Sequence, residues 1–313
     1  MKIVSVEPIG ISSAQSQEIQ GHFLSLGHDF IFYSDRKEDE ASLVYRMQDA
    51  DVVIISNIKL SEVVLSKCKN LKMLSVAFTG LDHIDLNYCK QHNIVVRNAS
   101  GYATTAVCEL TIGLILDVYR QITFLDAQTR NLQTRNNFLG RQMAGKTVGI
   151  IGTGAIGSAV ALSLQGLGCN VIAWNRSENQ VLINSGVEYL SLENLLVVSD
   201  IISVHLPLTE DTYHLLDASA LKLCKKDAII INTARGNIID MQALADMLTT
   251  GNLAGAGIDV FETEPPLLHN HPLIAAPNCI ITPHIGYATQ EAFQIRIGIV
   301  MENIMQWLKK VGN

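Results

Sequence analysis

Charged side chains and long apolar runs are both scarce in this 313-residue chain. Only 17% of its residues are charged and 48% are apolar, which is typical of a globular protein and excludes a disordered chain or a charge-rich coiled coil. Acidic residues outnumber basic ones by 30 to 23, so the net charge of -7 offers no basic surface for nucleic acid. No apolar run approaches the ~20 residues of a membrane helix, and the chain does not open with a signal-peptide pattern. The sequence therefore predicts a cytoplasmic protein that binds neither nucleic acid nor a membrane.

The cysteines also lack a pattern. Six are scattered along the chain, with no Cys-x-x-Cys pair and no Cys/His cluster of zinc-binding spacing. We therefore expect reduced cysteines that pack in the interior, and no metal site.

What the chain does contain is a regular alternation of short apolar runs and more polar helical stretches. This alternation is typical of parallel sheets whose strands are joined by crossover helices, and the length suits two domains of about 150 residues each. Beyond about residue 145, roughly six strands follow one another, the usual number in a dinucleotide-binding sheet. Long helices are predicted over 102–122 and 288–310. The predicted strands span 2–6, 30–33, 51–55, 71–76, 93–96, 147–151, 170–174, 200–205, 228–232, 256–259 and 279–282.

A glycine-rich loop follows the first strand of this second half. It reads Gly152-Thr-Gly154-Ala155-Ile156-Gly157, and a helical pattern comes directly after it. Gly152 permits a tight turn, Gly154 lets the backbone approach a pyrophosphate, and Gly157 lets the helix pack close to the strand. Between a strand and a helix, this motif predicts a dinucleotide-binding loop in which Ala155 and Ile156 begin the helix that faces the phosphates.

The end of the next strand bears on which dinucleotide is bound. A site that prefers NAD usually carries Asp or Glu here to bind the ribose hydroxyls. This chain has Asn175, Arg176 and Ser177 instead. An arginine and a serine can bind a 2′-phosphate that a carboxylate would repel. The pattern favours NADP, while a solvated Arg176 and the use of NAD remain the alternative.

Three further strands are each followed by a charged or titratable residue. Arg235 follows one, Asp259 and Glu264 follow the next, and His284 follows the last. Each alone is more often structural than catalytic. Together with a nucleotide loop they supply what carbonyl reduction needs: a cation for a substrate carboxylate, an acid for the developing alkoxide, and a carboxylate that orients the acid.

The order and spacing of these segments resemble the D-isomer-specific 2-hydroxyacid dehydrogenase family over essentially the whole chain. The resemblance implies an α/β fold of two Rossmann-like or flavodoxin-like domains, each a parallel sheet with helices on both faces, with the active site in the cleft between them. It implies a substrate-binding domain over 1–100, completed by 286–313, and a dinucleotide-binding domain over 101–285. The segments that carry it are Ala77-Phe-Thr-Gly80-Leu-Asp82-His-Ile-Asp85, Ala106-Val-Cys-Glu109-Leu, the Gly152 loop, Ser203-Val-His205-Leu-Pro207, Asn232-Thr-Ala-Arg235-Gly, Gly255-Ala-Gly-Ile-Asp259-Val-Phe-Glu-Thr-Glu264 and Pro283-His284-Ile-Gly.

The resemblance also implies roles for individual residues. Arg235 binds the substrate carboxylate and polarises the keto oxygen, and His284 is the general acid of reduction. Glu264 hydrogen-bonds His284 and favours its protonated form. Glu262 does not fit the family's register and is expected to face solvent. Other residues are implied in binding: Phe78, Thr79 and Gly80 with Arg235 and His284 for the substrate, and His205, Pro207, Thr233, Ala234 and Asp259 for the cofactor.

The implied reaction is hydride transfer between NAD(P)H and a small 2-oxoacid to give a D-2-hydroxy acid. Val76 stands where relatives that use 3-phosphoglycerate tend to carry arginine, although Arg97 and Arg296 could supply cations. Phe78 is expected to crowd the pocket. These features favour glyoxylate or hydroxypyruvate as substrate.

Alternatives to that reading remain open. A 3-phosphoglycerate dehydrogenase-like enzyme is one, and a dinucleotide-sensing binding protein of the same fold is another. The family habit of dimerising through the cofactor-binding domain, with the apolar helix 102–122, points to a homodimer. The loop 123–140 is expected to take part in the interface.

Overall fold

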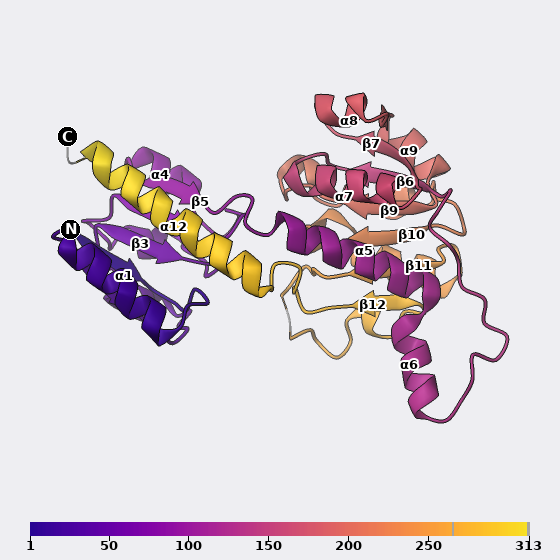
Figure 1. Cartoon of the computed structure of the whole chain (residues 1–313), viewed down its shortest axis with the longest axis horizontal. Coiled ribbons are helices and arrows are strands. Elements are labelled where there is room, and N and C mark those ends of the chain that lie inside the picture. The colour runs from indigo at the N-terminus through magenta and orange to yellow at the C-terminus, as the bar shows by residue number, and fades with distance from the viewer. Residues whose placement is uncertain (265, 312–313) are drawn as a thin grey trace. The chain divides into compact units, whose positions relative to one another are not determined.

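The computed structural model describes residues 1–264 and 266–311, and the chain forms two compact units (Figure 1). Unit 1 comprises Met1–Ala103 and the C-terminal segment that starts at Ala288, and unit 2 comprises Thr104–Tyr287. Each unit has its own parallel sheet flanked by helices, which confirms the predicted α/β fold. Among the described residues, no helix is long and apolar enough to cross a membrane.

The sheet of unit 1 has five parallel strands in the order β2-β1-β3-β4-β5. These strands are rich in Val and Ile, which favour extended backbone, and β3 and β4 are buried along their whole length. Crossover helices flank the sheet, as parallel strands require. The strands are β1 (Lys2–Ser5), β2 (Asp29–Phe32), β3 (Val52–Ile55), β4 (Met73–Val76) and β5 (Val95–Asn98), and the helices are α1 (Ser13–Ser25), α2 (Glu40–Met47), α3 (Glu62–Leu65), α4 (Leu86–Gln91) and α12 (Gln290–Val311).

The C-terminal helix α12 returns to the first unit and packs on β4. Ser75 in β4 donates its hydroxyl to the carbonyl oxygen of Val300 at 3.4 Å. Arg296 is 2% exposed, donates to the carbonyl oxygen of Ile9 at 2.6 Å, and lies over the Phe293 ring at 4.0 Å. The helix thus completes the core of unit 1.

The sheet of unit 2 has seven parallel strands in the order β12-β11-β10-β9-β6-β7-β8. The first strand of this unit, β6, lies between β7 and β9, so the strand order reverses at its carboxyl end, where such sheets bind ligands. The strands are β6 (Thr147–Ile151), β7 (Asn170–Trp174), β8 (Glu188–Tyr189), β9 (Ile201–Val204), β10 (Ile229–Asn232), β11 (Gly255–Ile258) and β12 (Cys279–Ile281).

Helices cover both faces of this sheet. On one face lie α5 (Thr104–Arg120), α7 (Ala155–Gly166) and α8 (Gln180–Asn184), and on the other lie α9 (Leu192–Val198), α10 (Ala218–Leu221) and α11 (Met241–Thr249). Short 3₁₀ turns complete the unit: η1 (Glu210–Thr212), η2 (Gly236–Ile238) and η3 (Pro272–Ile274). All six cysteines are free and five are buried, as expected for packing residues.

The structure corrects two local predictions. The helix predicted over 102–122 ends at Arg120, because Gln121 adopts a left-handed conformation with φ 48°. The predicted loop 123–140 begins as a second helix, α6 (Ile122–Arg130). The Asp117 carboxylate accepts the backbone N–H of Thr123 at 2.9 Å and so holds the start of this helix. The two-residue strand β8 was not predicted at all.

Candidate active site

The predicted catalytic residues of unit 2 come together at one edge of its sheet. Strands β10, β11 and β12 are consecutive neighbours and parallel, so the segments that follow them meet at the carboxyl edge. Arg235 follows β10, Asp259 and Glu264 follow β11, and His284 follows β12.

His284 and Glu264 form a hydrogen-bonded pair. The Nδ1 atom of His284 lies 2.8 Å from Oε2 of Glu264, the contact expected from the sequence. Because Nδ1 faces a carboxylate acceptor, it carries a proton, and Nε2 is the ring nitrogen with which His284 can exchange a second proton. His284 has φ 54°, a left-handed conformation that few residues other than glycine adopt. Something must therefore hold this loop in place.

Asp259 holds it. This residue is fully buried, and its carboxylate accepts the Thr282 hydroxyl at 2.6 Å and the backbone N–H groups of Ile285 and Gly286 at 2.8 Å each. Its own carbonyl oxygen accepts the backbone N–H of His284 at 2.9 Å. Burial raises the pKa of this carboxyl, although the hydrogen bonds favour its charged form. Asp259 thus fixes both sides of His284.

The loop that carries Arg235 is fixed by its neighbours. The buried Asn232 side chain accepts the N–H of Ala234 at 3.0 Å and donates to the carbonyl oxygen of Arg235 at 2.9 Å. At Gly236, a Cβ atom would collide with the backbone of Phe261, so only glycine allows this approach. The Arg235 loop and the segment leading to Glu264 are therefore in direct backbone contact.

Glu262 is exposed, as expected, and it also has a protein partner. Its Oε2 atom lies 3.2 Å from Nε2 of His271, nine residues further along. No sequence pattern indicates this pair, because the two residues do not have the spacing of metal ligands or of a catalytic motif.

The glycine loop has the geometry that a bound pyrophosphate requires. Gly152 has φ 97°, and a Cβ there would lie 2.7 Å from the carbonyl oxygen of His205. A Cβ at Gly157 would collide with the backbone of Gly152, so the helix α7 approaches its strand closely. At Gly154 there is open space, and no side chain caps the first N–H groups of α7. These N–H groups can therefore bind an anion.

In unit 1, the segment after β4 presents backbone donors. The carbonyl oxygens of Phe78 and Thr79 accept hydrogen bonds from Ala99 N–H at 3.0 Å and Asn98 Nδ2 at 2.6 Å. Within the described residues, the N–H groups of Thr79 and Gly80 have no protein acceptor. The Phe78 ring is 8% exposed and packs against the rings of His83 and Tyr102. Most of this ring is thus enclosed within unit 1.

Comparison with known proteins identifies the family. The family model described as D-isomer specific 2-hydroxyacid dehydrogenase, NAD binding domain, matches residues 112–286, more than half of the chain. The chain belongs to the D-isomer specific 2-hydroxyacid dehydrogenase family. It is 37% identical to a glyoxylate reductase of Thermococcus litoralis over 84% of this chain and 82% of that protein. It is 36% identical to a hydroxypyruvate reductase of Thermotoga maritima over 88% of this chain and 89% of that protein.

Solved structures agree with this assignment. An acyclic imino acid reductase in complex with NADPH and D-Arg has a TM-score of 0.90 and 31% sequence identity, and the match covers 99% of this chain and 98% of that one. As a family member, the chain is an NAD(P)-dependent dehydrogenase that acts on CH–OH groups.

The predicted preference for NADP rests on Asn175, Arg176 and Ser177, which lie at the carboxyl end of β7. Asn175 Nδ2 donates to the carbonyl oxygen of Ser177 at 2.8 Å, which closes a tight turn around Arg176. The Arg176 side chain is exposed, and within residues 1–264 and 266–311 it makes no hydrogen bond or ion pair with another protein group.

The remaining predicted cofactor residues are distributed around the carboxyl edge. Thr233 is buried, and its hydroxyl lies 3.0 Å from that of Thr111 in α5. The carbonyl oxygen of Pro207 accepts the Thr212 hydroxyl at 2.7 Å. His205 follows β9, and its Nε2 lies 2.8 Å from the Ser203 hydroxyl. Its Nδ1 is buried without a hydrogen-bond partner among the described residues, so a polar group of a ligand would satisfy it.

The burial of His205 predicts how the unfolding free energy of the unliganded protein depends on pH. Burial lowers the pKa of His205 to about 3, whereas an unfolded histidine titrates near 6.5. This residue's contribution to stability is therefore complete above about pH 6.5 and is lost as the pH falls toward 3. We expect it to cost the wild-type protein about 2 kcal/mol of unfolding free energy between pH 7.5 and pH 5. Urea unfolding of wild type and His205→Gln at both pH values measures this, and equal losses in the two proteins would contradict it.

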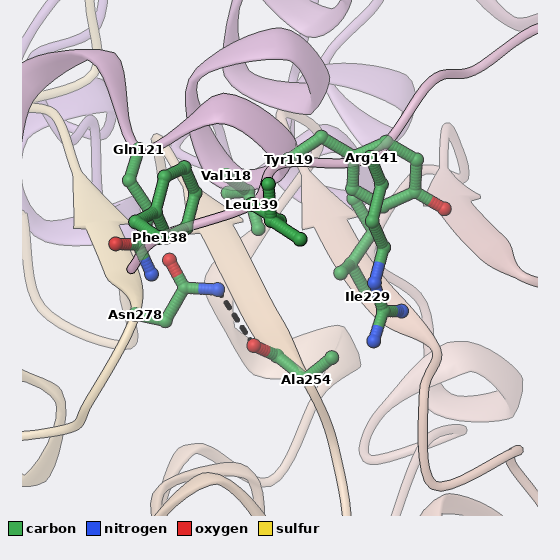
Figure 2. A pocket seen from close by; sticks show the side chains of 9 residues that line it. All are labelled: Val118, Tyr119, Gln121, Phe138, Leu139, Arg141, Ile229, Ala254 and Asn278. Carbon is green, nitrogen blue, oxygen red and sulfur yellow. Dashed lines mark hydrogen bonds between the residues drawn. The ribbon is translucent and has the colours of Figure 1, made fainter. Parts of the chain in front are cut away.

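A pocket lies at the opposite, amino edge of the sheet of unit 2 (Figure 2). It opens where β10, β11 and β12 begin, between the end of α5 and the segment 138–141. Asn278 donates to the carbonyl oxygen of Ala254 across its floor at 2.6 Å. None of the residues predicted for catalysis or cofactor binding lines it. Its lining residues are Val118, Tyr119, Gln121, Phe138, Leu139, Arg141, Ile229, Ala254 and Asn278.

Proposed function

We propose that this dehydrogenase reduces a small 2-oxoacid of the glyoxylate or hydroxypyruvate type to a D-2-hydroxy acid, and that it prefers NADPH to NADH. The observation that carries the proposal is the Glu264–His284 pair, at 2.8 Å, on the sheet edge that also bears Arg235 and the glycine loop.

Each catalytic residue has one task in this proposal. The Arg235 guanidinium binds the substrate carboxylate and polarises the keto oxygen, which its planar donors suit better than a lysine would. His284 donates the proton on Nε2 to the oxygen as it gains negative charge. The Glu264 carboxylate holds the ring by its Nδ1–H and stabilises the imidazolium. The nicotinamide dinucleotide, when bound, supplies the hydride.

The cofactor's phosphates are assigned to the backbone of Gly152 to Gly157, including Ala155 and Ile156 at the start of α7. The open space at Gly154 and the unpartnered Nδ1 of His205 support this assignment. Contacts to the cofactor from Pro207, Thr233, Ala234 and Asp259 stay predictions, as do contacts to the substrate from Phe78, Thr79 and Gly80. The N–H groups of Thr79 and Gly80 support a role in carboxylate binding.

The substrate preference is supported by the arginines of unit 1. Val76 is fully buried, and the buried Arg296 donates to the Ile9 carbonyl and lies over aromatic rings. Arg97 donates to Gln306 at 3.0 Å. A substrate phosphate needs cationic partners, and the engagement of both arginines within unit 1 favours a small uncharged substituent over 3-phosphoglycerate.

Initial rates with both reduced cofactors test this proposal. With glyoxylate, hydroxypyruvate, pyruvate, phenylpyruvate and phosphohydroxypyruvate as substrates, we expect the highest kcat/KM with NADPH and one of the first two. Arg176→Asp is expected to lower kcat/KM for NADPH by about tenfold or more and to leave that for NADH within a few-fold. The Lys226→Asp change, at another exposed cation of unit 2 that lies outside the cofactor site, serves as the charge-matched control.

Three outcomes would contradict parts of the proposal. A preference for NADH in the wild type would remove the role of Arg176. Phosphohydroxypyruvate as the best substrate would favour a 3-phosphoglycerate dehydrogenase. Tight NADPH binding without turnover of any 2-oxoacid would favour a dinucleotide-sensing protein.

We also propose that the enzyme is a homodimer joined through unit 2. The segment 121–141, which we call the arm, carries α6, and no residue of that helix is buried. Leu132 and Leu139 on the arm are 95% and 81% exposed. Two large apolar side chains this exposed, on a segment whose helix has no buried residue, favour a surface that another protein covers.

Light scattering tests the dimer. We expect a mass close to twice the 34.2 kDa of one chain. A double change of Leu132 and Leu139 to Glu is expected to shift the mass toward one chain, because two charges would be buried in the interface. Leu24→Glu, on an exposed site of unit 1, is the matched control. A wild-type mass of a single chain would rule the dimer out.

A further inference from the structure

A second carboxylate–histidine pair lies in the same segment as the catalytic one. Glu262 and His271 belong to the connection between β11 and β12, which also carries Glu264. The residues assigned above to catalysis and to binding do not include them. The side chain of His271 is mostly buried, at 12% exposed, whereas Glu262 is an exposed residue whose side chain is 34% exposed.

The hydrogen bonds define the protonation of this pair. The backbone N–H of Leu273 donates to Nδ1 of His271 at 3.3 Å, so Nδ1 is an acceptor. The ring proton is therefore on Nε2, which donates to Oε2 of Glu262 at 3.2 Å. The Phe261 ring meets the imidazole edge-on, with the centroids 5.4 Å apart. One imidazole thus ties Glu262 to the start of η3.

Glu264 depends on this connection for its position. Its side chain is 52% exposed and is hydrogen-bonded to His284. The chain before it is fixed where Phe261 meets Gly236, and the chain after it is fixed at Leu273, which is 1% exposed. The bond between Glu262 and His271 joins these two fixed points across the segment that carries Glu264.

We propose that Glu262 and His271 are positioning residues, whose bond holds the Glu264 carboxylate against Nδ1 of His284. This inference rests on the proposed function, in which the Glu264–His284 pair supplies the proton. Among the described residues, the titratable groups that face His284 include Glu264, the Tyr287 ring with its centroid 5.4 Å away and, one step removed, the buried Asp259, whose charge His284 affects. The charged group that faces His271 is Glu262. Loosening the bond between Glu262 and His271 lets the Glu264 carboxylate move away from His284. The protonated form of His284 is then less stabilised.

Two substitutions of His271 distinguish the loss of its bond to Glu262 from a general effect on the fold. The amide of His271→Asn can replace Nδ1 and still accept from Leu273, but it does not reach Glu262. The longer side chain of His271→Gln can replace Nε2 as the donor to Glu262. Glu262→Ala removes the bond from the other side. If Glu262 and His271 act only through their bond, the double change of His271→Asn with Glu262→Ala adds nothing to either single change.

The first measurement needs no turnover. The titration of the His284 ring is followed by NMR in histidine-labelled protein, and its signal is assigned with His284→Gln. We expect the titration midpoint to fall by about half a pH unit in His271→Asn, in Glu262→Ala and in the double variant, and to return toward wild type in His271→Gln. Equal midpoints in wild type and both single variants would overturn the inference.

Kinetics give the second measurement. In the reductive direction, His271→Asn and Glu262→Ala are expected to lower kcat about three- to tenfold above neutral pH, and to move the falling limb of the pH profile to lower pH. KM for the 2-oxoacid is expected to stay unchanged, because the Arg235 loop is not altered. A purely structural role would lower the unfolding temperature without moving the pH profile, and that result would also overturn the inference.

The two measurements distinguish the inference from the proposed function. If the wild type turns over no 2-oxoacid while the His284 midpoint still moves in the variants, the proposed function fails and the positioning of Glu264 stands. If the wild type turns over substrate and the midpoint does not move, the positioning role fails and the proposed function stands.

Discussion

Replacing His284 with glutamine is expected to lower kcat for 2-oxoacid reduction by about 10³-fold. Glutamine keeps a polar side chain of similar reach but cannot donate a proton to a developing alkoxide, and general acid catalysis typically contributes 10²–10⁴-fold. Cofactor affinity is expected to change little, because the glycine loop lies on β6 and α7 rather than on the β12 loop. Steady-state rates and a fluorescence titration with NADPH measure the two quantities.

The connection between β11 and β12 offers a control residue for the His284→Gln variant. His269 is exposed and follows β11 as Glu264 does, so His269→Gln makes the same chemical change away from the predicted site. We expect it to be fully active. A His284→Gln enzyme that keeps more than a tenth of the wild-type kcat would show that another group donates the proton.

The carboxyl-edge residues could be predicted from sequence because their placement follows from topology. Arg235, Asp259 and His284 each follow an apolar strand closely, and in a parallel sheet all such positions meet at one edge. The same reasoning located the glycine loop, since strand, turn and helix follow each other directly in the chain. The order of the elements along the chain and the regular parallel sheet were sufficient to predict where these residues lie.

Contacts across the β11–β12 connection could not be predicted in this way. The partner of Glu262 is nine residues away, and it is selected by the path of an irregular segment rather than by a periodic pattern. Asp259 is a similar case. The family resemblance implied a role for it in cofactor binding, and the structure adds that both of its carboxylate oxygens accept hydrogen bonds from the loop that carries His284. The sequence contains these residues, but only the structure shows which groups they bind.

The break between α5 and α6 shows a related limit. Residues 104–130 contain enough apolar positions for one long helix, and the chain turns at Gln121 without a glycine or proline. A left-handed glutamine and one aspartate-to-backbone bond from Asp117 are sufficient to end one helix and begin the next. One left-handed residue costs about 1–2 kcal/mol, which local hydrogen bonds can offset, and it leaves no strong signal in the sequence.

Changing Arg235 to lysine tests the other half of the catalytic arrangement. The positive charge is kept, but the two parallel N–H donors of the guanidinium are lost, and with them the bidentate grip on a carboxylate. We expect kcat/KM for the 2-oxoacid to fall by about 10²–10³-fold, as when one donor to a developing oxyanion is removed. The backbone of the loop is expected to stay in place, because Asn232 and Gly236 hold it through main-chain contacts.

Chemical rescue separates a lost guanidinium from a displaced loop. In Arg235→Ala, added guanidinium ion can occupy the vacated space, and we expect it to restore about tenfold of the lost rate while leaving wild type unaffected. Gly236→Ala makes the complementary change, because its Cβ collides with Phe261 while the guanidinium remains. That variant is expected to lose activity without responding to guanidinium. Since Gly236 touches the segment leading to Glu264, its loss of activity would show that the substrate cation and the proton donor are held in register through one backbone contact.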